Sequence, residues 1–298
     1  MTVDSLRDVT RVMDKLTPSQ AQTLDQWSEQ LQTGVRTLVE QGGPAARRVK
    51  NWLNGVWLGH SLHPALTDMA IGSWWTGFLL DLVGARRAAD ASITVGVLAA
   101  VPTALSGAAD WSDTEGEQRR TGLVHAVLNS AGLGCMVVSL FARRAEQRTI
   151  GFLLSALGLS LTTFSAWLGG ELVFRQGTGV NRNAWAPSVD DFHAVIGAEA
   201  LEPGKLVGAE LEVDGQKVPL VLLKKGGSIL ALHATCSHWG GPLAEGKLVD
   251  DCVECPWHGS QFSMHDGAVV QGPATAPQPA FEARVRNGSI EVRRRAPV

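Results

Sequence analysis

The chain has little of several features that would narrow its class at once. It holds only four cysteines among 298 residues, and this usage does not indicate a disulfide framework. Charged residues make up only 18% and the net charge is −3, so there is no basic excess of the kind that binds nucleic acid. The first ten residues, MTVDSLRDVT, lack an apolar core, so we expect no cleavable signal peptide.

Two short boxes combine cysteine with histidine. Cys236-Ser237-His238 is followed, after sixteen residues, by Cys255-Pro256-Trp257-His258. Each box offers one thiolate and one imidazole. Such a set can hold a tetrahedral zinc ion, or a [2Fe–2S] cluster with two thiolates on one iron and two imidazoles on the other.

The residues around the boxes separate these alternatives. The first box continues as CSHWGGPL and the second as CPWHGSQF, and GPA follows at 272–274. These segments resemble the Rieske iron–sulfur family over roughly residues 192–296, whereas zinc fingers do not carry such flanks. The resemblance implies a small antiparallel β fold. It also implies that Cys236 and Cys255 bind the inner iron, while His238 and His258 bind the outer one.

The resemblance also implies supporting roles around the cluster. Glycines allow the ligand loops to turn tightly, a serine hydroxyl can bond a cluster sulfur, and a proline-containing loop shields the metal. The residues at these positions are Gly240, Gly241, Gly259, Ser260, Gly272 and Pro273. His233 and His265 flank the boxes without fitting the ligand pattern, and Cys252 is interpreted as a bystander thiol.

Two departures from the high-potential branch of the family are informative. That branch carries an extra cysteine in each ligand loop, but Gly241 and Trp257 occupy those positions here. Its second hydroxyl donor, a tyrosine, is replaced by Phe262, and the chain has no tyrosine at all. Fewer donors stabilise the reduced cluster less, so we expect a potential below the top of the Rieske range.

A strongly apolar region precedes the boxes. It contains four apolar stretches, near 64–83, 91–109, 122–141 and 149–173. Each is close to the ~20 residues that cross a bilayer, and their small residues suit close helix packing in lipid. A soluble four-helix bundle is the alternative, but no stretch shows the polar face that it requires. The segment from Leu58 also resembles a bacterial four-helix membrane domain of uncharacterised function.

We therefore predict a multidomain chain: an all-α four-helix transmembrane bundle followed by a small all-β Rieske domain. The expected parts are an amphipathic helical arm at 1–55, the membrane domain at 56–175, a linker at 176–190 and the Rieske domain at 191–298. Within the arm we expect helices at 4–16 and 18–41, the second capped by Thr17. Tight turns are expected at Asp214-Gly215, Gly226-Gly227 and Asn287-Gly288.

The membrane region offers one clue to chemistry. His63 and His125 begin the first and third stretches, which run parallel, so they lie at the same depth. His60 and His193 are expected on the same face. A haem or another metal held by His63 and His125 would account for this gathering, and structural hydrogen bonding is the alternative.

These patterns predict a membrane-anchored one-electron carrier that works with a redox partner protein, either a reductase or an acceptor. Two alternatives stay open: a subunit of a membrane oxidoreductase whose bundle binds haem or quinone, and a non-redox cluster sensor. A Rieske oxygenase is disfavoured, because no segment supplies its catalytic iron domain. We expect a multi-pass protein of the cell membrane with the Rieske domain on the cytoplasmic side, since the loop cysteines are missing.

Overall fold

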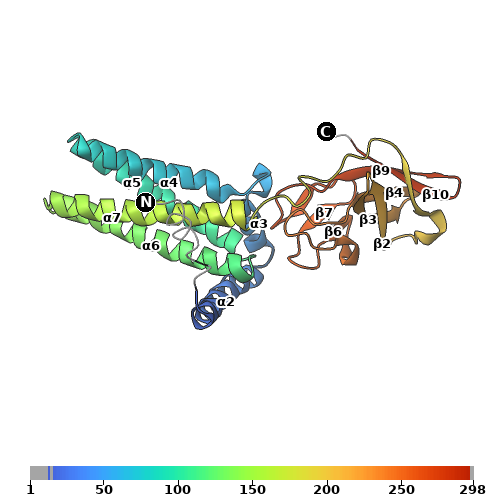
Figure 1. Cartoon of the computed structure of the whole chain (residues 1–298), viewed down its shortest axis with the longest axis horizontal. Helices are drawn as coiled ribbons and strands as arrows, with labels where there is room; N and C mark the ends of the chain where they lie inside the picture. The colour runs from blue at the N-terminus through green and yellow to red at the C-terminus, as the bar shows by residue number, and fades with distance from the viewer. Residues whose placement is uncertain (1–12, 14–15, 296–298) are drawn as a thin grey trace. The chain divides into compact units, whose positions relative to one another are not determined.

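The structure, a computed structural model, describes residue 13 and residues 16–295. They form two compact units (Figure 1). One contains the described residues up to Arg47 together with Leu62–Thr178, and the other contains Arg48–Ser61 and the described residues from Gly179 onward. Most of the predicted helix at 4–16 lies outside the described residues.

Six α-helices precede the strands in this part of the chain. They are α2 (Pro18–Gln41), α3 (Gly43–Asn54), α4 (Leu62–Leu82), α5 (Arg86–Trp111), α6 (Gly116–Arg144) and α7 (Arg148–Gly170), with the short turns η2 (Val56–Leu58) and η3 (Glu171–Arg175). Thr17 caps α2 as predicted: its side chain accepts from the Gln20 amide, and the Gln20 side chain reaches back to the Thr17 amide. Helix α2 packs against α5 and α6, where buried Gln32 donates to the carbonyl oxygens of Trp111 and Thr114.

Helices α4 to α7 pack as a closed ring of four. Helix α4 contacts α5 and α7, and α6 contacts the same two helices, so α4 and α6 are diagonal. Three helical segments of the described chain are long and apolar enough to cross a membrane: α5, α6, and α7 continued through η3. The prediction of four membrane spans is therefore confirmed for three helices. Helix α4 does not qualify, because Asp68 and Asp81 and the run Ser73–Thr76 lower its hydropathy.

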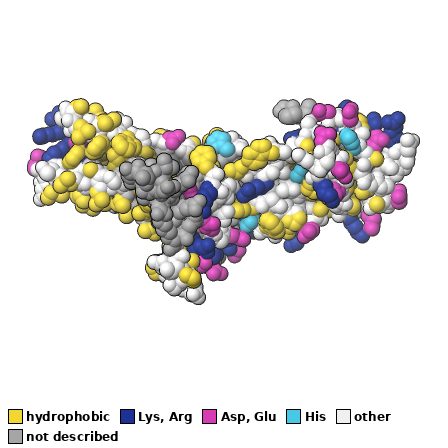
Figure 2. Space-filling model, in the orientation of Figure 1, with side chains coloured by type: hydrophobic (Ala, Val, Ile, Leu, Met, Phe, Trp, Pro, Cys, Tyr) yellow, Lys and Arg dark blue, Asp and Glu magenta, His cyan; other side chains and the backbone are white. Residues whose placement is uncertain are grey.

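The outer surface of the ring is apolar. Figure 2 shows hydrophobic side chains over much of the visible face of this unit. Large exposed apolar residues include Leu79, Leu98, Val101, Leu105, Val127, Val138, Phe141 and Leu153. A soluble bundle would place such side chains inside, so this surface fits a lipid environment.

The ring consists of two copies of one helical hairpin, a repeat that the sequence analysis missed. Residues 62–111 correspond to residues 124–173 at a constant offset of 62 positions. The turns match: Gly84 and Glu146 both have positive φ (77° and 61°). The next amides also match, because Ala85 bonds the carbonyl five residues back at 2.9 Å and Gln147 does the same at 2.9 Å.

The helix crossings repeat as well. A Cβ placed on Gly96 would lie 3.0 Å from the carbonyl oxygen of Ala70, and one on Gly158 would lie 2.8 Å from that of Gly132. These are equivalent positions of the two hairpins, and both allow close backbone approach. The bundle is therefore a tandem repeat whose equivalent residues meet across its centre.

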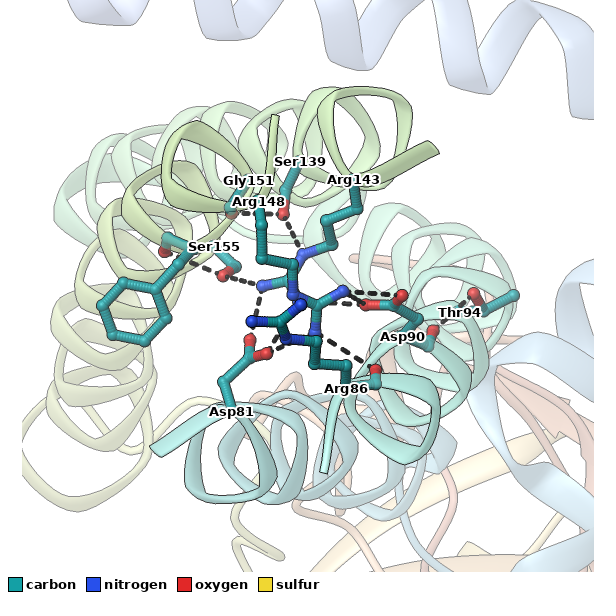
Figure 3. A network of polar contacts seen from close by, with 10 residues as sticks. Asp81, Arg86, Asp90, Thr94, Ser139, Arg143, Arg148, Gly151 and Ser155 are labelled. Atoms are coloured by element: carbon teal, nitrogen blue, oxygen red, sulfur yellow. Dashed lines mark hydrogen bonds and ion pairs between the residues drawn. The ribbon is translucent and has the colours of Figure 1, made fainter. Parts of the chain in front are cut away.

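Charged side chains close one end of the bundle (Figure 3). Arg143 is buried and bonds both carboxylates of the cluster, Asp81 at 2.5 Å and Asp90 at 3.0 Å. Arg148 binds the same two carboxylates at 2.6 and 2.7 Å. The Ser139 hydroxyl accepts from Nε of Arg143, and the Ser155 hydroxyl accepts from the same Nη2 that bonds Asp81. Asp81 and Arg143 are equivalent positions of the repeat, so opposite charges at one repeat position satisfy each other.

The second unit is an antiparallel β structure of two sheets. The six-stranded sheet has the order β1-β10-β9-β4-β3-β2 and the four-stranded sheet the order β5-β6-β7-β8. The strands are β1 (His193–Gly197), β2 (Leu206–Val213), β3 (Gln216–Lys225), β4 (Ser228–His233), β5 (Lys247–Val249), β6 (Cys252–Glu254), β7 (Gln261–Ser263), β8 (Val269–Gln271), β9 (Ala280–Arg286) and β10 (Ser289–Arg294).

The predicted hairpin turns are confirmed. Asp214-Gly215, Gly226-Gly227 and Asn287-Gly288 join β2 to β3, β3 to β4 and β9 to β10. The non-glycine members adopt positive φ, 51° at Asp214 and 52° at Asn287, as tight hairpin turns require. One apolar core of this unit contains Cys236 and Cys255 beside Leu243, Val253 and Phe262, so packing alone already brings the two thiols together.

Candidate metal centre

Two loops with the same hydrogen-bond pattern carry the cysteine–histidine boxes. In the first, the Cys236 amide donates to the carbonyl oxygen of Gly241 (2.8 Å) and the Gly240 amide donates back to that of Cys236 (2.9 Å). In the second, the Cys255 amide donates to Ser260 (2.8 Å) and the Gly259 amide to Cys255 (3.1 Å). Gly240 and Gly259 close these turns with φ of 82° and 72°, which a glycine adopts without strain.

Each cysteine sulfur lies in a cluster of backbone N–H groups. The amides of His238 and Trp239 donate to the sulfur of Cys236, and those of Trp257 and His258 donate to the sulfur of Cys255. Such donors favour a thiolate over a thiol. The loops are therefore shaped for two buried sulfur anions.

In the candidate site, the two cysteines contact each other and the two histidines contact each other. Cys236 and Cys255 are 1% and 2% exposed, and their sulfurs hydrogen-bond to each other. The rings of His238 and His258 meet edge to face with centroids 5.1 Å apart. In the described residues, no three His, Cys, Asp or Glu side chains lie close enough to hold a single ion. This two-plus-two arrangement fits a binuclear cluster better than a mononuclear zinc site.

The pKa shifts of Cys255 and His238 favour the protonation states that bind metal. The hydrogen bond between the sulfurs raises the pKa of Cys236 and lowers the pKa of Cys255 to about 6; burial raises that of Cys236 further. Burial lowers the pKa of His238 to about 3, helped by positive charge on His258, Lys50 and Arg182. His238 is thus neutral at pH 7, and its buried Nδ1 has no hydrogen-bond partner among the described residues. A buried imidazole nitrogen with a free lone pair beside two paired thiols is a donor set for metal, so these residues fit a [2Fe–2S] cluster.

The predicted supporting residues surround this group. A Cβ on Gly241 would lie 2.7 Å from the sulfur of Cys255, so glycine lets the first loop pass this close to the sulfur without a shift. The Ser260 hydroxyl is buried and accepts from the Ala274 amide at 3.0 Å, which leaves its own proton to donate. Gly272 and Pro273 lie in the following loop, where the Gly272 amide donates to the side chain of Asn51 at 3.1 Å.

Several contacts come from segments that the sequence analysis did not connect with the site. Arg182 and Asn183, in the predicted linker, bond the first loop: the Arg182 amide donates to Ser237 (3.0 Å) and the Asn183 side chain to Thr235 (2.9 Å). The Arg182 guanidinium also lies 5.4 Å from the Trp239 ring centroid. No local sequence motif identifies Arg182 and Asn183, because only the tertiary fold brings them to this loop.

The remaining candidates are placed as follows. His233 is buried at the end of β4 and accepts from the Thr235 amide, whereas His265 is exposed. Cys252 lies half-buried on β6 as a free thiol. Neither histidine nor Cys252 joins the four-residue group.

In the helical unit, the structure brings His63 and His125 together, with ring centroids 6.1 Å apart. His60 is exposed and bonds the adjacent Ser61 carbonyl, and His193 lies on β1.

Comparison with known proteins identifies both parts. Residues 191–282 match the Rieske [2Fe-2S] domain family, and residues 59–182 match a family described as predicted membrane protein DUF2231.

Three relatives are ferredoxins or ferredoxin subunits. The anthranilate 1,2-dioxygenase ferredoxin subunit of Burkholderia cepacia is 38% identical over 27% of this chain and 73% of its own length. Ferredoxin CarAc of Metapseudomonas resinovorans is 33% identical over 33% and 89%. The 3-phenylpropionate/cinnamic acid dioxygenase ferredoxin subunit of Escherichia coli K12 is 36% identical over 28% and 78%. The chain therefore belongs to the Rieske [2Fe-2S] family, with a membrane domain preceding its Rieske domain.

Proposed function

We propose that this chain is a membrane-anchored electron carrier whose redox centre is a Rieske-type [2Fe–2S] cluster. The single observation that supports this best is the pair of matched loops, which present two buried sulfurs and two adjoining imidazoles. A bound cluster supplies one-electron oxidation and reduction, and performs no bond chemistry itself. The apolar helices anchor the carrier in the membrane.

In this proposal, Cys236 and Cys255 hold the inner iron, and His238 and His258 hold the outer one. The burial of both thiols in the core supports the first assignment, because it places them away from solvent. Trp257, 57% exposed and adjacent to His258, supports the second, because it places the histidine side of the site near the surface. Electrons would enter and leave at this edge.

The surrounding residues set the environment of the centre. Backbone amides stabilise the sulfur charge, and the Ser260 hydroxyl can donate to the same group. Gly241 and Trp257 preclude the loop disulfide of the high-potential branch, and buried Phe262 lacks the hydroxyl that would add a further donor. We infer a ferredoxin-like potential below the top of the roughly −150 to +300 mV Rieske range.

The relatives described above are ferredoxins or dioxygenase ferredoxin subunits, which supports a protein as the electron donor and another as the acceptor. We therefore expect the acceptor in a separate protein. We place the Rieske domain on the cytoplasmic side, where loop cysteines are not needed. Protease cleavage at the 176–190 segment in sealed vesicles of known orientation tests this placement.

Two other functions remain distinguishable by experiment. A bundle that binds haem or quinone and uses it to oxidise or reduce a substrate would make the chain a subunit of a membrane oxidoreductase. A non-redox cluster sensor would contain the cluster without turning over electrons. Reduction of the cluster by host extracts with NADH or NADPH would support the carrier, while failure with every cytosolic and membrane fraction would favour the sensor.

The direct test of the site is chemical analysis of the purified full-length protein. We expect equal amounts of cluster iron and acid-labile sulfide, and a Rieske-type EPR signal after reduction. Protein that contains zinc, or iron without sulfide, would contradict the proposal.

A further inference from the structure

The internal repeat places His63 and His125 at equivalent positions of diagonal helices. Histidine is retained at both positions, although most other residues differ between the two hairpins. The rings meet edge to face near the centre of the bundle, with centroids 6.1 Å apart and an interplanar angle of 78°. Two symmetric imidazoles facing a common centre form a possible ligand pair.

Equivalent carbonyl groups orient both rings. Nδ1 of His63 lies 2.9 Å from the Thr103 carbonyl oxygen, and Nδ1 of His125 lies 2.7 Å from that of Ser165. A carbonyl oxygen can only accept, so each Nδ1 carries the proton and each Nε2 keeps its lone pair. A hydrogen bond of this type from the second ring nitrogen to a backbone carbonyl is characteristic of histidines that bind metals.

One polar contact competes with this role. The Asn129 amide donates to Nε2 of His125 at 3.1 Å. The repeat equivalent of Asn129 is Thr67, whose hydroxyl instead bonds the carbonyl oxygen of His63. Among these described contacts, a side chain therefore bonds Nε2 only in His125. The Asn129 amide must rotate away before that nitrogen can bind a metal.

Glycines at equivalent positions make room for the rings. A Cβ on Gly107 would lie 2.7 Å from the His63 ring, and one on Gly169 would lie 3.3 Å from the His125 ring. Gly72 and Gly134, also a repeat pair, have nothing within 4 Å, so a methyl group added there would meet no ring.

We propose that His63 and His125 are the two axial ligands of a haem iron in the helical bundle. The number of ligands favours haem over a bare ion. No third His, Cys, Asp or Glu joins the pair within the described chain, whereas a structural zinc ion needs four ligands. A porphyrin supplies four nitrogens and two negative charges, so it completes the coordination of iron and avoids an uncompensated dication in an apolar bundle.

A haem at His63 and His125 would take part in one-electron transfer. Both histidines lie at the end of the bundle where α4 and α6 begin and α7 ends, which is the end from which the chain continues toward residue 179. A haem held by His63 and His125 would supply an iron that takes up the single electron given by a reduced [2Fe–2S] cluster, with no bond formed or broken. This electron-transfer step rests on the proposed function, whereas haem binding does not.

The first experiment is visible and EPR spectroscopy of full-length protein, purified in detergent from cells supplied with 5-aminolevulinate. We expect the bands of a low-spin, six-coordinate b-type haem, and more iron than acid-labile sulfide. His63→Gln and His125→Gln should each remove the six-coordinate spectrum, while His60→Gln and His193→Gln should not. Absence of haem from the wild-type protein, a metal without porphyrin, or haem that survives both variants would overturn the proposal.

A second experiment separates ligation from a purely structural role. In a His63→Gly variant, added imidazole should restore the six-coordinate spectrum, which a histidine needed only for packing would not do. Gly107→Ala should weaken haem binding by about 10- to 100-fold, as loss of ligand orientation does. Gly72→Ala and Gly134→Ala are the matched controls and should bind haem normally.

The Rieske EPR signal keeps the two proposals distinguishable. It should persist in every one of these variants, which shows that the Rieske unit of each variant folds; recovery of each variant in the membrane fraction shows that it inserts. Failure of imidazole to restore the spectrum, in a variant that keeps the Rieske signal, would overturn the haem proposal and leave the proposed carrier function intact.

Discussion

Two pairs of histidines meet edge to face in this chain, one in each unit, and their surroundings differ. The ring centroids of His238 and His258 lie 5.1 Å apart beside two buried thiols, whereas those of His63 and His125 lie 6.1 Å apart between helices α4 and α6. In the first pair, Nδ1 of His238 is buried and unpartnered. In the second, both Nδ1 atoms bond backbone carbonyls.

The comparison shows that the partner of one ring nitrogen decides what the other can do. A carbonyl oxygen at Nδ1 fixes the proton there and leaves Nε2 for a ligand, as in the bundle. A free, buried Nδ1 makes that atom itself the candidate ligand, as in the Rieske unit. The same residue type thus prepares two different coordination modes, and the following predictions test them in order of expected effect.

The largest effect is expected at the Rieske pair. Replacing His238 by Ala removes one ligand of the outer iron, so iron and acid-labile sulfide should both be lost, together with the Rieske EPR signal. His265→Ala, at an exposed histidine near the same loops, is the control and should keep the cluster. Retention of normal sulfide in the His238 variant would refute the ligand assignment.

The network of Arg143, Arg148, Asp81 and Asp90 extends the comparison, because its opposite charges pair with one another and need no ligand. Arg143→Gln leaves the buried Asp81 carboxylate short of a partner, and we expect a loss of about 3–5 kcal/mol in stability. Thermal unfolding of the bundle in detergent, followed by circular dichroism, measures this. Arg144→Gln alters the adjacent exposed arginine and should change little. Equal stability of the two variants would mean that the network contributes no more than surface charges.

His233 provides a buried histidine that is not a ligand. Burial lowers its pKa to about 4, with a further contribution from the positive charge of Arg294. The unfolded chain binds this proton below pH about 6.5 and the folded chain only near pH 4, so stability is present above pH 6.5 and is lost as the pH falls toward 4. The full effect is about 3 kcal/mol.

The measurement compares urea unfolding of the full-length protein at pH 7 and pH 4.5, followed by the visible circular dichroism of the cluster. His233→Asn should show a smaller drop between the two values than the wild type, while His265→Asn should follow the wild type. An identical drop in the His233 variant would exclude this histidine as the source.

The smallest effect concerns the potential of the cluster. Ser260→Ala removes a hydroxyl beside the centre, and loss of one hydrogen bond to a charged group, about 1.5 kcal/mol, lowers a one-electron potential by about 60 mV. Phe262→Tyr should shift it in the opposite direction. Potentiometric titration measures both, and an unchanged potential in the serine variant would show that its hydroxyl serves only the Ala274 amide.

Sequence reasoning predicted the features that depend on local residues. The cysteine–histidine boxes and the Asn-Gly and Asp-Gly turns are short motifs whose geometry is set within a few residues, and the structure confirms the turns and brings the four box residues together. The count of membrane spans was correct for three helices. It failed for α4 because Asp68 and Asp81 offset the apolar residues around them.

The features that sequence reasoning missed depend on distant contacts. Asn51 reaches Gly272, and Arg182 reaches Ser237, through the fold, so no spacing rule marks them. The hairpin repeat was detectable, because His63 and His125, like Gly107 and Gly169, recur at an offset of 62 residues. Identities between the copies are sparse, so the shared backbone contacts reveal the repeat more clearly than the sequence.

The most direct test of the central claim is an EPR-monitored redox titration of the full-length protein in its native membranes. A cluster held by Cys236, His238, Cys255 and His258 should give one Rieske-type signal that follows a one-electron curve, with a midpoint below the top of the Rieske range. The signal should vanish when His258 is replaced by alanine. A signal of another type, or one that persists without that histidine, would contradict the account.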